Sequence, residues 1–115
     1  HLVDKLLDEG FYVRVLDNLS NGKLENLEYA QKKQNFEFIK GDILDKNTCI
    51  QALQEIDYVF HLACLGVRHS IHSPFENHRV NAEGTLNILE ASRKVNIRHF
   101  FYISTSEIYG KTKQF

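Results

Sequence analysis

The sequence has no methionine or tryptophan, one proline and two cysteines among its 115 residues. Cys49 and Cys64 are too far apart for a CxxC motif, and they indicate a reducing cytoplasmic environment rather than a disulfide framework. The 14 basic side chains nearly balance the 15 acidic ones, so no charge excess points to nucleic acid or to an anionic membrane. No apolar run approaches the roughly 18 residues that a membrane-spanning helix needs.

The two ends of the chain predict an internal fragment of a longer protein. Methionine is absent, and an apolar stripe at helical spacing starts at once with Leu2. Gly10 suits the residue in left-handed conformation that ends such a helix. We expect a missing strand before His1, which would leave a gap of roughly 9–10 Å, or two strand spacings, between the first and third strands present. Such a chain is expected to be inactive, and to be poorly stable or to rearrange.

Helical and strand patterns alternate along the chain, which predicts one α/β domain over residues 1–115. We expect a Rossmann-like, doubly wound parallel sheet that lacks its first strand. The third and fourth strands are nearly continuous apolar runs, typical of strands covered on both faces. Asp45 is a candidate N-cap, Cys64–Ser73 is expected to be a loop, and Pro74 is expected to open a long helix. The expected strands are Tyr12–Leu16, Phe36–Lys40, Tyr58–Ala63 and His99–Ile103, and a short helix is expected over Lys23–Tyr29.

Polar residues follow the strands at the edge where ligands bind in such sheets. An acid at Asp17 can accept hydrogen bonds from both hydroxyls of an adenosine ribose and would repel a 2′-phosphate, which favours NAD over NADP. Asp42 can hold an adenine amino group, with Ile43 at the ring edge. The alternatives are a solvated turn for Asp17 and an N-terminal helix cap for Asp42.

The most specific stretch follows the last strand. A hydroxyl at Ser104 or Thr105 can hydrogen-bond a substrate alcohol, and Glu107 can act as a general acid or base. The alternative is a Ser/Thr turn with an exposed acid. Four histidines have spacings that match no metal signature, so we predict no metal site there. They are His61, His69, His72 and His78.

Five stretches, in order along the chain, resemble the extended short-chain dehydrogenase/reductases that act on nucleotide sugars. Each stretch is weak by itself, but five in register cover nearly the whole chain. They are VLDNLSNG (Val15 to Gly22), KGDILD (Lys40 to Asp45), DYVFHLAC (Asp57 to Cys64), NAEGTLNILEAS (Asn81 to Ser92) and STSEIYG (Ser104 to Gly110).

This resemblance implies roles for individual residues. The implied cofactor is NAD, with Asp17 and Asn18 at the adenosine ribose, Asp42 and Ile43 at adenine, Leu62, Ala63 and Leu65 lining the cofactor, and Ser104 near the nicotinamide ribose. Asn81 would support the active-site end of the long helix, and residues 66–70 would lie near the sugar. Thr105 matches the catalytic Ser/Thr that binds the sugar hydroxyl being oxidised.

The family's Tyr-x-x-x-Lys spacing also occurs here, at Tyr109 and Lys113. We interpret this match as a decoy, because the family places its catalytic tyrosine a few tens of residues after Thr105. The catalytic tyrosine and lysine are therefore expected beyond Phe115.

The implied reaction oxidises a nucleotide-bound hexose at carbon 4 to a transient 4-keto sugar. Glu107 resembles 4,6-dehydratases and UDP-glucuronate decarboxylases, whereas residues 64–70 resemble epimerases, and we favour a UDP-glucose 4-epimerase-like enzyme. The resemblance also implies that the parent forms a homodimer through the helix that begins at Pro74 and a second helix beyond Phe115.

Two alternatives belong to other classes. A non-catalytic NAD-binding sensor would lack the downstream tyrosine and lysine. The other alternative is a doubly wound scaffold without any nucleotide, which is open because fold alone does not give function. Such a scaffold would lack the upstream glycine-rich turn.

Overall fold

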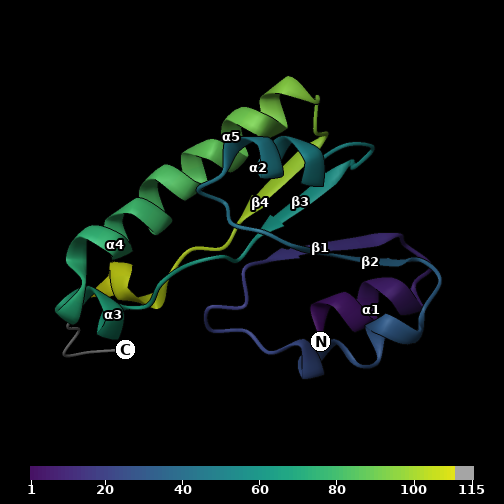
Figure 1. Ribbon diagram of the computed structural model, residues 1–115, viewed down its shortest axis with the longest axis horizontal. Coiled ribbons are helices and arrows are strands. Elements are labelled where there is room, and N and C mark those ends of the chain that lie inside the picture. The colour runs from purple at the N-terminus through teal and green to yellow at the C-terminus, as the bar shows by residue number, and fades with distance from the viewer. Residues whose placement is uncertain (111–115) are drawn as a thin grey trace.

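The computed structural model describes residues 1–110, in which the strands form two parallel pairs (Figure 1). Strand β1 (Val13–Asp17) pairs with β2 (Phe36–Lys40), and β3 (Tyr58–His61) pairs with β4 (His99–Tyr102). No strand ladder joins β1 to β3 within this part of the chain. The parallel α/β class is therefore confirmed, the expected gap between the pairs is not closed by rearrangement, and low stability stays a prediction.

Helix α1 (Leu2–Asp8) is terminated by Gly10 two residues after its last turn, as the sequence predicts. Gly10 has φ 84°, and its N–H donates to the Leu7 carbonyl at 3.1 Å while the Phe11 N–H donates to the Leu6 carbonyl at 3.0 Å. These two bonds form a Schellman motif, which turns the chain directly into β1. Leu7 then packs with Val13 and Ala30 in a small core on one face of the β1–β2 pair.

Two expectations about the connecting segments are wrong. The helix predicted over Lys23–Tyr29 is shorter and of the 3₁₀ type, η1 (Leu24–Leu27), and a second 3₁₀ helix, η2 (Ala30–Lys32), follows it. The predicted loop Cys64–Ser73 contains helix α3 (Val67–His72). Its sequence has two apolar residues, Val67 and Ile71, which are too few for the periodicity to indicate a helix.

Helix α2 (Lys46–Ala52) begins where the sequence predicts. Its N-cap, Asp45, accepts hydrogen bonds from the Asn47 N–H at 2.9 Å and from the Thr48 hydroxyl at 2.8 Å. These bonds hold the pKa of Asp45 below its ordinary value, with the Thr48 hydroxyl the largest cause. The cap places the first turn of α2 directly after the Gly41–Asp42 strand end.

Pro74 opens the long helix as predicted, but the helix has three parts. These are α4 (Pro74–His78), a π-helical segment η3 (Arg79–Gly84) and α5 (Thr85–Lys94). A Cβ on Gly84 would lie 2.5 Å from Cδ1 of Ile43, so the glycine lets the helix approach the β2–α2 loop closely. The apolar spacing did not reveal the π segment, because six residues are too few to separate its period from that of an α-helix.

Helices α2 and α5 lie side by side over the β3–β4 pair and form the larger core with it (Figure 1). Its buried members are Ile43, Cys49, Leu53, Ile88 and Ala91, with Leu16, Val59 and Phe100 packed against them. None of the described helices combines the length and hydropathy that crossing a bilayer requires.

The prediction that the last two strands are covered on both faces is wrong for the described residues. Val59 and Phe100 face the larger core, whereas Tyr58, Phe60 and Phe101 are exposed. Successive side chains of a strand point to opposite faces, and the described helices cover only one face of this pair. On the open face the Phe60 and Phe101 rings stack with centroids 4.7 Å apart.

Candidate functional site

The strand ends of β1 and β2 bring three predicted residues together. The Asn18 Nδ2 donates to Oδ2 of Asp42 at 3.1 Å, while Oδ1 of Asp42 accepts from the Leu44 N–H at 2.8 Å. Oδ1 of Asp17 accepts from the Leu19 N–H at 2.6 Å. Asp17 and Asp42 are thus fixed by turns of their own strand ends, with Asn18 as the bridge. We call this arrangement the adenosine end of the candidate site, after the ligand that the sequence analysis predicts for it.

Gly22 is a part of this end that the sequence analysis missed. A Cβ at this position would lie 3.0 Å from Oδ2 and 3.4 Å from Oδ1 of Asp17, so a glycine keeps the surroundings of the carboxylate open. Carboxylate oxygens accept hydrogen bonds from hydroxyl and amino groups, which are the groups that an adenosine presents. The residues present therefore fit the adenosine part of NAD. The motif around Gly22 was the available signal, but a glycine in such a loop is equally typical of an ordinary turn.

Ile43 lies at this strand end but points away from it. Its side chain is buried in the larger core, and its carbonyl accepts from Nδ2 of Asn87 at 3.0 Å and from the thiol of Cys49 at 3.2 Å. Burial raises the pKa of the Cys49 thiol to about 11, so this cysteine is an inert structural group. The predicted contact of Ile43 with adenine stays a prediction, and it requires backbone atoms.

The end of β3 leaves Leu62 and Ala63 exposed, as a surface that lines a cofactor requires. Asn81, which the sequence analysis placed among the site residues, bonds through its side chain to the chain itself. Its Oδ1 accepts from the Leu65 N–H at 2.7 Å, and its Nδ2 donates to the Leu65 carbonyl at 2.8 Å. Asn81 therefore acts on this end of the site by fixing the backbone of Leu65.

The end of β4 carries the predicted catalytic residues. The Ile103 N–H donates to the His61 carbonyl at 3.3 Å, and the exposed Ser104 and Thr105 follow. The chain then turns through η4 (Ser106–Tyr109), where the Ile108 N–H donates to the Thr105 carbonyl at 3.4 Å. The side chain of Glu107 and all of Lys113 lie outside the described residues.

Two of the four noted histidines bond to other side chains. His61 is buried, with Nε2 2.9 Å from Oγ1 of Thr85, and burial lowers its pKa. Nε2 of His69 lies 2.8 Å from a carboxylate oxygen of Glu76. In the part of the chain that the structure describes, His, Cys, Asp and Glu form no group of three that could hold a metal ion.

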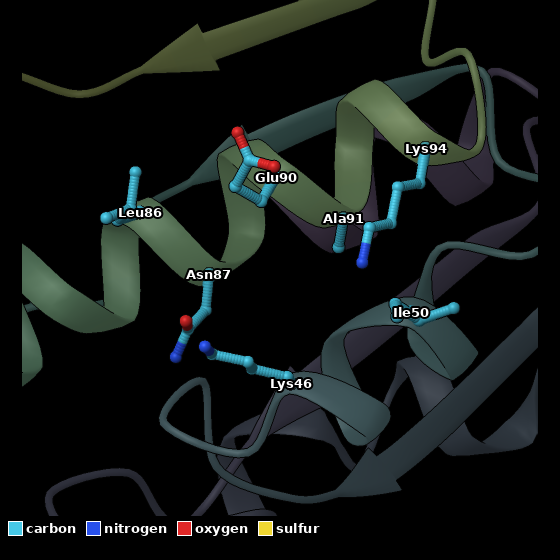
Figure 2. Close-up of a pocket in the computed structure, with 7 residues that line it drawn as sticks. All are labelled: Lys46, Ile50, Leu86, Asn87, Glu90, Ala91 and Lys94. Atoms are coloured by element: carbon cyan, nitrogen blue, oxygen red, sulfur yellow. The ribbon is translucent and has the colours of Figure 1, made fainter.

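A hollow of about 160 Å³ lies elsewhere, between α2 and α5 (Figure 2). Lys46 and Asn87 approach each other at one end, and Lys94 and Ile50 lie at the other. Its volume is below the roughly 300 Å³ at which ligand pockets begin, and no predicted site residue lines it. The candidate site is therefore the strand-end edge and not this hollow.

The whole chain, residues 1–115, matches the model of the family described as GDP-mannose 4,6 dehydratase. The chain belongs to this family of extended short-chain dehydrogenase/reductases. The predicted resemblance and the Rossmann-like fold are thereby confirmed.

Other members of the family carry different activities. The chain is 39% identical over 111 residues to UDP-glucuronic acid decarboxylase 1 of Arabidopsis thaliana, which covers 96% of this chain and 24% of the relative. The solved UDP-N-acetylglucosamine 4-epimerase of Methanobrevibacter ruminantium M1, in complex with UDP-N-acetylmuramic acid, is 36% identical with a TM-score of 0.88. That match covers 98% of this chain and 36% of the solved one.

NAD is the cofactor found in solved members of the family. The UDP-glucose 4-epimerase of Thermus thermophilus is solved as a complex with NAD, and it is 35% identical with a TM-score of 0.76. The match covers 87% of this chain and 32% of that one. The chain thus spans about a quarter to a third of the length of these relatives. These matches establish the family and its cofactor.

Proposed function

We propose that this chain forms the NAD-binding part of a nucleotide-sugar 4-epimerase that resembles UDP-glucose 4-epimerase. The observation that carries the proposal is the grouping of Asp17, Asn18 and Asp42 at adjacent strand ends. In this assignment Asp17 and Asn18 bind the adenosine ribose, and Asp42 binds the adenine amino group. The negative charge of Asp17 selects against the 2′-phosphate of NADP.

The other strand ends face the reacting part of the substrate in this proposal. Leu62, Ala63 and Leu65 line the cofactor, and Ser104 lies by the nicotinamide ribose. The Thr105 hydroxyl holds the hexose hydroxyl on carbon 4 in place, and Glu107 assists proton transfer. NAD, when bound, supplies the hydride acceptor for oxidation at this carbon. The base that takes the hydroxyl proton is a tyrosine beyond Phe115, and Tyr109 is not that base.

Further features support a cytoplasmic homodimer. Cys49 and Cys64 are both free, which fits a reducing compartment. The helix from Pro74 exposes Leu86 and Leu89, 58% and 44% accessible, on α5. Apolar side chains on an exposed helix fit the packing of two copies of the parent protein.

A second candidate is a UDP-glucuronate decarboxylase. The observation that favours it is the 39% identity to the Arabidopsis thaliana decarboxylase over 111 residues. A 4,6-dehydratase shares the same first oxidation step. The three activities differ in the fate of the oxidised sugar, and residues 64–70 are the segment that favours the epimerase.

The proposal is tested on the complete protein that carries these residues, supplied with NAD and with UDP-glucose, UDP-glucuronate or dTDP-glucose. Epimerisation leaves the product mass unchanged, dehydration removes water and decarboxylation removes carbon dioxide, so mass spectrometry and proton NMR separate the three. The Thr105→Val variant is expected to lose about 100-fold in kcat, while the matched Thr48→Val variant on α2 retains turnover. NAD binding without any turnover would contradict the proposal and identify a sensor.

A further inference from the structure

Helix α3, which follows β3, is not held in place by the apolar core. None of its six residues is buried, and Val67 and Ile71 are 48% and 72% exposed. Burial of apolar side chains ordinarily supplies most of the stability of a helix in a protein. The position of α3 must therefore depend on other contacts.

One such contact is the His69–Glu76 pair, 2.8 Å apart, and two asparagines of the neighbouring helix hold the turn that leads into α3. Nδ2 of Asn77 donates to the carbonyls of Leu65 at 2.8 Å and Gly66 at 3.2 Å. Asn81 bonds both the N–H and the carbonyl of Leu65, and its Nδ2 also donates to Oδ1 of Asn77 at 3.2 Å. The four bonds to the backbone converge on Leu65 and Gly66, and Gly66 is the N-cap of α3. We call Asn77 and Asn81 the asparagine clamp.

The clamp is joined to β3 by a row of polar side chains spaced four residues apart. Thr85 follows Asn81 by four residues, and its hydroxyl donates to the Asn81 carbonyl at 2.8 Å. The Thr85 Oγ1 also lies 2.9 Å from Nε2 of the buried His61. Asn81 lies in the π-helical segment η3, a type of segment that is frequent at functional sites. The row therefore ties the turn before α3 to β3, the strand that precedes it.

We propose that Asn77 is a positioning residue that, with Asn81, places residues 66–70 and α3 at the sugar-binding end of the site. This inference rests on the proposed function for its substrate, a nucleotide sugar. Asn77 acts through the backbone of Leu65 and Gly66 and does not touch the substrate. Its loss therefore weakens the binding of the sugar and leaves the adenosine end of the site intact.

The test uses the complete protein with the substitution Asn77→Ala. The KM for the nucleotide sugar is expected to rise about 10-fold, because two hydrogen bonds that fix the turn are lost. The kcat and the Kd for NAD are expected to change less than about threefold, a change worth under one hydrogen bond. Amide hydrogen exchange over residues 67–72 is expected to accelerate. Asn77→Asp, which keeps the size but removes both donors, serves if the alanine variant fails to fold.

Asn87→Ala is the matched control. Asn87 lies on the same long helix, and its Nδ2 donates to the carbonyls of Ile43 at 3.0 Å and Leu44 at 3.2 Å, so an equivalent pair of bonds is lost at another loop. The inference is overturned if KM for the sugar is unchanged in Asn77→Ala, or if Asn87→Ala raises it equally. If the wild-type protein turns over no nucleotide sugar, the proposed function fails. Unchanged exchange over residues 67–72 would then overturn the clamp separately.

Discussion

The two strand pairs of this molecule differ in how completely they are covered. The β1–β2 pair has α1 on one face and α2 on the other (Figure 1). Arg14 of β1 links the second face to α2, since its Nη1 donates to the carbonyls of Ala52 at 3.1 Å and Gln54 at 2.7 Å. Within residues 1–110, the β3–β4 pair is covered on one face only, and the aromatic side chains of its other face are exposed.

This difference separates the two ends of the candidate site. The polar groups of the adenosine end are fixed by hydrogen bonds among Asp17, Asn18, Asp42 and their own turns. The end proposed to be catalytic follows β3 and β4, where the contacts come from helix α4 and its continuation rather than from a closed core. The comparison teaches that the proposed cofactor end follows the more fully covered strand pair, whereas the proposed substrate end depends on side chains of one helix.

The largest expected effect comes from disrupting the close contact between the long helix and the β2–α2 loop. Gly84→Val would place a branched side chain where a single Cβ already lies 2.5 Å from Ile43 Cδ1. Both residues are buried, so overpacking is expected to lower the free energy of unfolding by about 2–3 kcal/mol. Urea denaturation checks the loss. Gly66→Ala is the control, because a Cβ there meets nothing within 4 Å, and an equal loss in both variants would contradict the account.

A smaller effect sharpens the difference between the two faces of β3. In the 115-residue chain, Val59→Ala should lower the free energy of unfolding by about 1–2 kcal/mol, because Val59 packs against the larger core. The adjacent Phe60→Ala should cost less than the roughly 3–5 kcal/mol of a buried phenylalanine, because Phe60 is 37% exposed and its aromatic stack adds only about 0.5–1.5 kcal/mol to the area it covers. Denaturant titrations of both variants give the two losses. A loss of about 3–5 kcal/mol in Phe60→Ala, the value for a buried phenylalanine, would show that the open face is covered and would contradict the account.

The smallest effect probes the covered face of the same pair through pH. Burial lowers the pKa of His61 below its ordinary value of 6.5, so the unfolded chain takes up a proton that the folded chain resists. The stability contributed by neutral His61 is present above pH 6.5 and is lost as the pH falls below it. His61→Gln should reduce the fall in unfolding free energy between about pH 7.5 and about pH 5.5. An unchanged fall in the variant would exclude His61 as its cause.

Local rules predicted most of the fold from the sequence. The stop at Gly10, the cap at Asp45 and the start at Pro74 each depend on one residue and its immediate neighbours, and all three are confirmed. Strand β2 was predicted with its observed bounds. The exposed face of β3–β4 could not be read from the sequence, because an apolar run does not say which element covers it.

The candidate site was predictable to the same extent. Asp17 and Asp42 were placed by the rule that parallel strands end at one edge, and that rule needs only the order of elements. The asparagine clamp was missed because its targets are backbone atoms, which no sequence pattern marks. The spacing of Asn77, Asn81 and Thr85 was the available signal, since residues four apart share one helix face.

The central claim is that Asp17 reads the adenosine ribose of NAD, and calorimetric titration of the complete protein with NAD and NADP tests it most directly. We predict at least about 10-fold tighter binding of NAD, and a loss of about 10- to 100-fold in NAD affinity in Asp17→Asn, the range for hydrogen bonds to a charged group. Asp57→Asn, which changes an exposed carboxylate just before β3, should bind NAD like the wild type. Equal affinity for NADP, or unchanged NAD binding by Asp17→Asn, would contradict the account.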